Sequence, residues 1–209
     1  MPSFLTRSQF NEACQAFVSK HNDGGSSSPG IGLSGWCWKE HAYVPSMGFL
    51  TRTVMLHRTI YDMDSEDQEA DEAATKPTAT ESLSCHQHVA YSASFQVPAF
   101  YFNIFDSNGS PLPISDILET AFFRSSIRED TKATTFAVSA GDAAFPLLSQ
   151  GDHPVLGSPS WYLHPCETAN VVGELMDEIQ HNPDWNDESR LVRWLETWFM
   201  VVGTAVDLE

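Results

Sequence analysis

The pattern of apolar and polar positions predicts helices at both ends of the chain and strands between them. Near the N-terminus, Phe10, Ala13, Cys14 and Phe17 recur at helical spacing after Thr6, whose hydroxyl can cap the helix. Cys14 is therefore expected in the core. Two further apolar stripes with the same period lie towards the C-terminus. The first comprises Val171, Val172, Leu175, Met176 and Ile179, and the second comprises Leu191, Trp194, Leu195, Trp198 and Val202.

The middle of the chain is rich in β-branched and aromatic residues, which predicts strands. The expected strands cover residues 36–38, 48–61, 85–95, 99–105 and 134–138. Asp106-Ser107-Asn108-Gly109 is a strong turn signal, and a helix is expected over residues 116–123. Strands in the middle with helices at both ends favour an α+β fold with an antiparallel sheet.

At 209 residues the chain is long enough for one domain and short for two. Residues 62–82 differ in character from the rest, with eight acidic residues and a single lysine, Lys76. Such a segment buries too little apolar area to offset the entropy lost on ordering, which predicts a disordered acidic insertion. An acidic docking segment is the alternative.

Charge and cysteine usage narrow the class of protein. A formal net charge of -17 and a pI near 4.6 argue against nucleic-acid binding, which selects basic faces. No run approaches the ~20 apolar residues of a membrane span, and residues 1–10 lack the layout of a secretory signal. The four cysteines are scattered without a CxxC pair, which is typical of a reducing compartment. We therefore expect a cytoplasmic protein.

The octet WYLHPCET, residues 161–168, is the most informative segment for function. Its aromatic lead-in predicts a strand, Pro165 ends that strand, and Thr168 is expected to cap the next helix. Cys166 then lies at a strand-to-helix break, where another molecule can reach it. His164 precedes it by two residues and would share its side of an extended segment. His164 is thus a candidate to assist the thiol, or a histidine that only hydrogen-bonds within the fold.

The surroundings of Cys166 in the sequence favour acyl transfer over hydrolysis. No lysine or arginine occurs between Lys132 and Arg190, while that interval holds nine carboxylates. A hydrolase needs a strongly activated thiol, and nearby cations normally supply that activation. Accepting an already activated acyl group needs no such help and no metal or cofactor, because one thioester replaces another. Its later attack by a lysine amine needs the amine deprotonated and the oxyanion held.

Four motifs together carry a resemblance to a known family. They are HVAYSASFQVPAFYF at residues 88–102, HPVLG at 153–157, HPCET at 164–168 and WLETWFMVVGTAV at 194–206. In combination they resemble the autophagy ubiquitin-like conjugating enzymes, over a stretch from about His88 to Val202. The resemblance implies a ubiquitin-conjugating-enzyme-like α+β core.

The resemblance also implies partners and roles. Cys166 would take the modifier autophagy-related protein 12 from its activating enzyme, autophagy-related protein 7, as a thioester. The modifier would then pass to a lysine of autophagy-related protein 5. Tyr91 matches a tyrosine that the family presents before the Val-Pro step and is carried over as a catalytic candidate, although Phe95 stands where an aromatic hydroxyl is often found. Ordinary ubiquitin-conjugating enzymes place an asparagine after His-Pro, so here the oxyanion donor must come from elsewhere.

Three other functions compete with this one. A cysteine hydrolase could use His153 with Asp152. An inert domain of the same fold could simply dock a partner. A zinc site would need ligands from two segments to meet, namely Cys85, His86 and His88 with His164 and Cys166. A phosphatase loop is excluded, because residues 164–170 lack the arginine and glycines that cradle phosphate.

Overall fold

The computed structural model describes residues 4–22, 33–60, 79–125, 131–140, 146–166, 168–179 and 184–208. The helices of these parts are α1 (Arg7–Asn22), α2 (Ile114–Glu119), α4 (Thr168–Ile179) and α5 (Asp187–Val202). The strands are β1 (Cys37–His41), β2 (Val44–Ile60), β3 (Ala79–Ser92), β4 (Val97–Phe105), β5 (Thr131–Ala133), β6 (Ala137–Ala140), β7 (Leu148–Asp152) and β8 (Pro159–Leu163).

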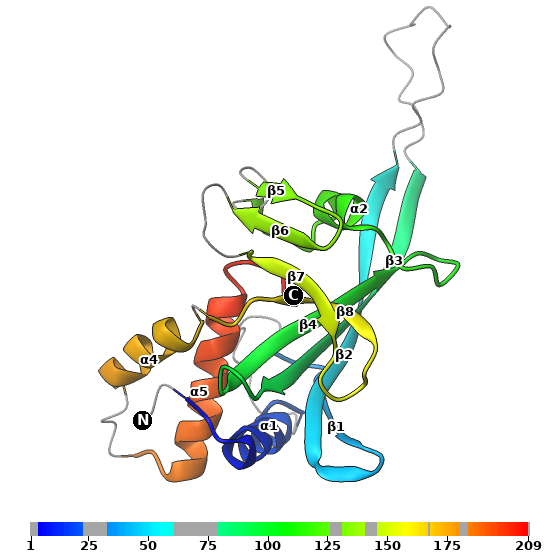
Figure 1. Cartoon of the computed structure of the whole chain (residues 1–209). Coiled ribbons are helices and arrows are strands. Elements are labelled where there is room, and N and C mark those ends of the chain that lie inside the picture. The colour runs from blue at the N-terminus through cyan, green and yellow to red at the C-terminus, as the bar shows by residue number, and fades with distance from the viewer. Residues whose placement is uncertain are drawn as a thin grey trace, which may run out of the picture.

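The described strands form one eight-stranded sheet in the order β1-β2-β3-β4-β8-β7-β6-β5, and each neighbouring pair is antiparallel (Figure 1). β8 is inserted between β4 and β7, although β5 to β7 precede it in the chain. Helices lie at the two ends of the described chain, with α1 beside α5 (Figure 1). The predicted α+β class with an antiparallel sheet is confirmed.

Strand alternation divides the buried side chains between the two faces of the sheet. On β4, Phe100 and Phe102 belong to the main core, while Ala99 and Tyr101 belong to a second, smaller cluster. The helical residues expected at the centre are buried as predicted. The main core includes Phe10, Cys14 and Phe17 of α1 and Leu191, Trp194, Leu195, Trp198 and Val202 of α5. We call the face that these helices cover the helix face, and the opposite one the outer face.

Three predicted elements are wrong in detail. The strand predicted over residues 85–95 ends at Ser92, because residues 93–96 form the turn that leads into β4. Residues 134–138 were expected as one strand, but Thr134 begins the turn that joins β5 to β6, and its N–H donates to the Ala137 carbonyl. The helix expected over residues 116–123 is α2, which ends at Glu119. It ends there because the Thr120 hydroxyl donates to the Ile117 carbonyl and accepts from the Phe122 N–H, which competes with a further helical turn.

Most of the predicted acidic insertion falls outside the described residues. Residues 62–78 of the insertion are among those that the structure does not describe. Residues 79–82, at the end of the predicted insertion, instead form the start of β3. There Glu81 lies opposite Arg58 of β2, and their side chains form an ion pair of 2.8 Å.

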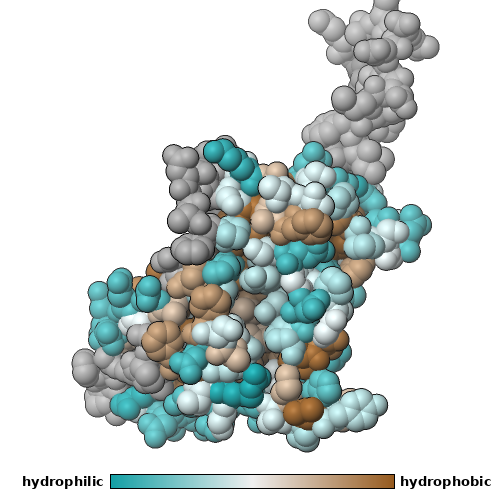
Figure 2. Space-filling model, viewed as in Figure 1, coloured by the Kyte–Doolittle hydropathy of each residue, from teal (hydrophilic) through white to brown (hydrophobic). Residues whose placement is uncertain are grey.

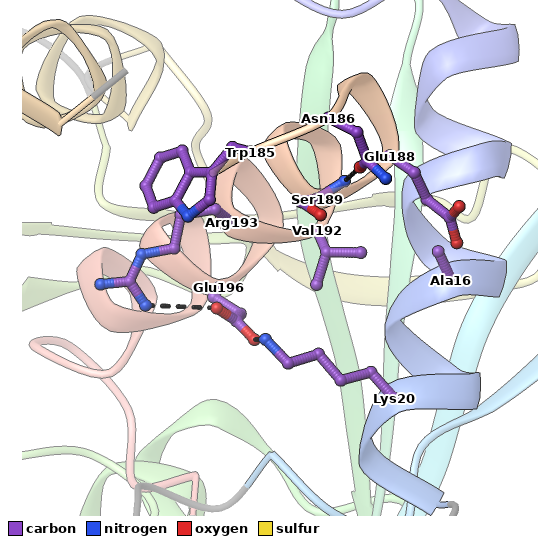
Figure 3. Close-up of a pocket in the computed structure, with 9 residues that line it drawn as sticks. All are labelled: Ala16, Lys20, Trp185, Asn186, Glu188, Ser189, Val192, Arg193 and Glu196. Atoms are coloured by element: carbon purple, nitrogen blue, oxygen red, sulfur yellow. Dashed lines mark hydrogen bonds and ion pairs between the residues drawn. The ribbon is translucent and has the colours of Figure 1, made fainter. Parts of the chain in front are cut away.

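Glu196 of α5 ties the first and last helices together. Its carboxylate, 8% exposed, accepts from Lys20 Nζ at 2.7 Å and pairs with His21 Nε2 at 3.0 Å, both on α1. Arg193 of α5 also donates to it (Figure 3). Burial opposes ionisation of Glu196, but hydrogen bonds from Lys20 and His21 outweigh it and lower the pKa. The carboxylate is therefore ionised and holds the α1–α5 contact in register.

The outer-face cluster is centred on two histidines. His153, 1% exposed, packs against His88 and Tyr101 with ring centroids 5.0 Å away in each case. Its Nδ1 accepts the Val155 and Leu156 N–H groups and so organises the turn between β7 and β8. Burial, and then the neighbouring His88, lower the pKa of His153 to about 3.

The Glu196 contact yields a stability prediction. Glu196→Ala should lower the free energy of unfolding by about 2 kcal/mol, because it removes a buried acceptor shared by three donors. Glu188→Ala is the matched control. Glu188 is an exposed carboxylate that lines the same surface hollow as Glu196 (Figure 3), and its replacement should change stability by less than about 0.5 kcal/mol. Urea unfolding at pH 7 measures both. Equal effects of the two substitutions would contradict the assigned role of Glu196.

The buried imidazole predicts sensitivity to acid. His153 has an ordinary pKa near 6.5 in the unfolded chain and about 3 in the folded chain, so between these values the unfolded state binds more protons. Stability should therefore fall as the pH is lowered from 6.5, by about 2 kcal/mol at pH 5 from this group. In His153→Asn, which keeps an acceptor for the turn but cannot titrate, the loss between pH 7 and pH 5 should shrink by that amount. Urea unfolding at both pH values measures it, and an unchanged loss would refute the assignment.

Candidate active site

Cys166 lies where the chain leaves the central strand β8. β8 is paired with β4 at Trp161 and Tyr162 and with β7 along its whole length, and the His164 N–H extends the pairing by donating to the Leu147 carbonyl at 2.9 Å. The chain then turns at Pro165, and α4 begins at Thr168. The predicted strand, break and helix are therefore present.

The turn that carries the thiol packs over a group of apolar residues, which we call the apolar seat. Pro165 is buried, and it lines a shallow hollow together with Leu163 of β8 and with Trp198 and Val202 of α5. The Thr168 hydroxyl donates to the Pro165 carbonyl at 2.8 Å, which fixes the start of α4. Thr168 was expected to accept a hydrogen bond as a cap, and the structure shows it as a donor to the turn instead.

Cys166 differs from the buried cysteines in its accessibility. It is a free thiol of intermediate exposure, and Cys37 is exposed, whereas Cys14 and Cys85 are buried. Burial raises the pKa of the Cys14 thiol, and it raises the pKa of Cys85 to about 12. Those two thiols are therefore protonated and enclosed, which leaves Cys166 and Cys37 as the accessible sulfurs among the four.

His164 lies on the outer face and is held by aromatic rings. Its imidazole meets Phe95 edge to face, with centroids 5.2 Å apart and an interplanar angle of 77°, and the centroid of the Tyr162 ring lies 6.4 Å away. Phe95 comes from the turn between β3 and β4, so this contact joins two segments that are distant in sequence. Pro165 and Cys166 lie in a turn, so strand alternation no longer decides which way the thiol points relative to His164.

Tyr91 projects into the helix face, unlike His164. It is 6% exposed, and its ring packs against Phe10 of α1 at 5.8 Å, beneath the Arg7 guanidinium at 4.8 Å. Its hydroxyl donates to the Leu5 carbonyl at 2.8 Å. The structure thus connects Tyr91 with the N-terminal segment and places its ring on the other side of the sheet from the imidazole of His164.

The residues of the competing hypotheses are arranged differently. His153, the base required for a hydrolase, is enclosed by Phe49, His88 and Tyr101 in the outer-face cluster. For zinc, Cys85 is buried in the helix-face core while its neighbours His86 and His88 face outward. Within the described ranges, no group of three or more cysteine, histidine or acidic side chains could hold a metal ion.

The surface beyond the thiol is partly apolar. Val171 and Leu175 belong to the apolar stripe of α4, yet they are 41% and 40% exposed, because α4 buries Ala169, Val172 and Met176. Figure 2 shows apolar side chains at the surface in the region of α4 and α5. Exposed apolar surface next to a reactive group is typical of a site where another protein docks.

Sequence reasoning missed the apolar seat and the Phe95–His164 contact. The seat brings together residues of β4, β8 and α5, and no local pattern indicates such long-range proximity. The position of Tyr162 beside His164 could have been predicted, since the two residues alternate on one side of a strand.

Every helix in the described residues is too short or too polar to span a lipid bilayer.

Comparison with known proteins places this geometry in a family. The family model "Autophagocytosis associated protein, active-site domain" matches residues 9–209. The ubiquitin-like-conjugating enzyme ATG10 of Homo sapiens is 30% identical over 148 residues, which are 71% of this chain and 58% of that protein. The proteins of the same name from Dictyostelium discoideum and Arabidopsis thaliana are 30% and 31% identical, each over 58% of this chain.

The chain matches only part of each relative. The chain spans 58%, 49% and 48% of the human, Dictyostelium and Arabidopsis proteins, about half the length of the curated relatives that it matches. The family model, in contrast, covers nearly the whole chain, including the segment that carries Cys166. The chain therefore belongs to the family of autophagocytosis associated proteins, as their active-site domain.

Proposed function

We propose that this chain is a ubiquitin-like-protein conjugating enzyme that carries its modifier as a thioester on Cys166. The observation that carries the proposal is the partly exposed free thiol at the break between β8 and α4, within the active-site domain of this family. The modifier is autophagy-related protein 12, delivered by autophagy-related protein 7 and passed to a lysine of autophagy-related protein 5. The reaction takes place in the cytoplasm and serves autophagosome formation.

The first step is an exchange of thioesters. The sulfur of Cys166 attacks the C-terminal carbonyl of the modifier, its new bond to carbon replaces the bond to the activating enzyme, and that enzyme's thiol leaves with the proton. Because one sulfur ester replaces another, the step needs no cofactor on this chain. An accessible sulfur on a firmly held turn meets its requirements.

The second step transfers the modifier to an amine. A neutral lysine nitrogen attacks the thioester carbonyl, a tetrahedral oxyanion forms, and the carbon–sulfur bond then breaks to return the thiol of Cys166. The unpaired N–H groups at the start of α4, two residues after Cys166, supply positive potential for the developing oxyanion. Exposed carboxylates on α4, such as Glu174 and Glu178, favour the approach of a cationic acceptor side chain.

The remaining site residues support this transfer. His164 is the imidazole nearest in sequence to the thiol, and we assign it to assist transfer by orienting or taking a proton from the attacking amine. Tyr91 contributes indirectly, through the N-terminal segment to which its hydroxyl donates. The exposed apolar residues Val171 and Leu175 provide contact area for a protein substrate.

The proposal predicts a diagnostic change of adduct chemistry. With activating enzyme, modifier and ATP, the native chain should form an adduct that reductant removes. Cys166→Ser should form one that reductant leaves intact, because an oxyester replaces the thioester. Gel electrophoresis with and without reductant measures both.

Cys37→Ser is the matched control, since Cys37 is the other accessible thiol and its replacement should leave the adduct unchanged. The absence of an adduct on both the native chain and Cys166→Ser would refute the proposal and favour an inert docking domain. Turnover of simple thioesters by the chain alone would favour a hydrolase.

A further inference from the structure

The turn between β3 and β4 has an unusual backbone. Gln96 has a φ of +54°, and among the described residues it is the only one other than glycine with a positive φ. A side chain in this left-handed region costs of order 1 kcal/mol or more and persists only where surrounding contacts enforce it. Its side chain is exposed, so the cause lies in the backbone contacts of the turn.

The N-terminal segment enforces this conformation. The Leu5 N–H donates to the Gln96 carbonyl at 2.8 Å, and the Gln96 N–H donates to the Ser92 carbonyl at 2.8 Å. Leu5 is itself fixed, because its side chain is 2% exposed and its carbonyl accepts from the Tyr91 hydroxyl at 2.8 Å. Tyr91, Leu5 and Gln96 thus form a hydrogen-bonded chain across the end of the sheet.

The strained turn presents one ring to the candidate active site. Phe95, directly before Gln96, is 38% exposed, yet it meets the imidazole of His164 edge to face at 5.2 Å. Such a pair is worth ~0.5–1.5 kcal/mol. A phenyl ring has no proton to exchange, so Phe95 cannot itself act as an acid or a base in the transfer step.

We propose that the Tyr91–Leu5–Gln96 chain holds the β3–β4 turn so that Phe95 orients His164 for the transfer step. Phe95, Gln96, Leu5 and Tyr91 are therefore positioning residues. Backbone pairing to Leu147 fixes the main chain of His164, and the remaining freedom lies in its side-chain torsions. The Phe95 ring, in direct edge-to-face contact, restricts those torsions, and the Tyr162 ring lies farther away at 6.4 Å.

This role rests on the conjugating activity proposed above and concerns its second step. Loading requires only that the sulfur of Cys166 reach the activated carbonyl. Transfer additionally requires a group correctly placed beside the attacking amine, and a misplacement of about 1 Å can cost up to ~100-fold in rate. Loss of the ring contact should therefore slow transfer while loading proceeds.

A double-mutant cycle isolates the contact. Phe95→Ala, His164→Ala and the double variant are loaded with modifier, and the thioester is then chased with free lysine in a single turnover. We expect each single substitution to slow the chase roughly tenfold or more and the double variant to be no slower than His164→Ala alone. Phe136→Ala is the control, because Phe136 is 66% exposed in the β5–β6 turn and its removal should change neither step.

Two substitutions at position 96 test the backbone conformation. Gln96→Gly keeps the left-handed conformation without steric cost and should transfer like the native chain. Gln96→Val introduces a β-branched side chain that this conformation disfavours, and it should slow transfer as Phe95→Ala does. Tyr91→Phe, which removes only the hydroxyl, should also slow transfer, but by less than Gln96→Val does. Thermal unfolding of each variant shows that it is folded at the assay temperature.

The outcomes separate the two proposals. If the native chain fails to load, the proposed function is wrong and the positioning role falls with it. If the native chain loads and transfers while Phe95→Ala transfers equally fast, the positioning role alone is wrong. It is also wrong if Phe95→Ala slows transfer as much in the His164→Ala background as in the native one, or if Gln96→Gly and Gln96→Val behave alike.

Discussion

The pairing of β8 on both of its edges is the constraint on which the rest of the structure depends. A strand bonded to β4 on one side and β7 on the other cannot shift along its axis without breaking both ladders. The point where the chain leaves the sheet is therefore set by the fold, and Pro165 makes the departure abrupt. Trp198 and Val202 of α5 lie beside Pro165 of the turn and belong to the main core. The same aromatic core that stabilises the domain therefore also places Cys166 at the surface.

The two faces of the sheet have separate tasks. The helix face carries the large aromatic core, and the carboxylate of Glu196 ties α1 to α5 along it. The outer face carries the rings around His153 and continues through Tyr101 and Tyr162 to His164. The Tyr91–Leu5–Gln96 hydrogen-bonded chain connects the two faces at the end of β3, because its tyrosine belongs to one face and the turn that it holds serves the other.

Long periodic segments were predictable from the sequence because their burial follows the helical repeat. Phe10 and Phe17 of α1 lie in the core, as do Trp194 and Trp198 of α5, and the helical spacing predicted this burial. Short, polar strands were not predictable. β5 and β6 are stabilised by pairing with each other, whereas the β propensity of residues 134–138 predicted a single strand where the turn between them lies. Val171 and Leu175 follow an apolar period yet lie at the surface, since α4 has a core on one side only.

The candidate site divides in the same way. Cys166 could be found from its motif, because a proline between a strand and a helix exposes the residue that follows. The partners that hold the site could not, since the contacts between Leu5 and Gln96 and between Phe95 and His164 join segments about 70 to 90 residues apart in sequence. The resemblance assigned Tyr91 to the site, and the structure shows the hydrogen bond through which such a residue can act without facing the imidazole.

The central claim is that position at the break between β8 and α4, and not exposure alone, decides which sulfur carries the modifier. Cys37 is the more exposed of the two accessible thiols, so the claim can be tested directly. Peptide mapping by mass spectrometry, after loading with activating enzyme, modifier and ATP, locates the thioester. The account predicts that the modifier's C-terminus is attached to the peptide containing Cys166. Attachment to the peptide containing Cys37, or to both in comparable amounts, would contradict it.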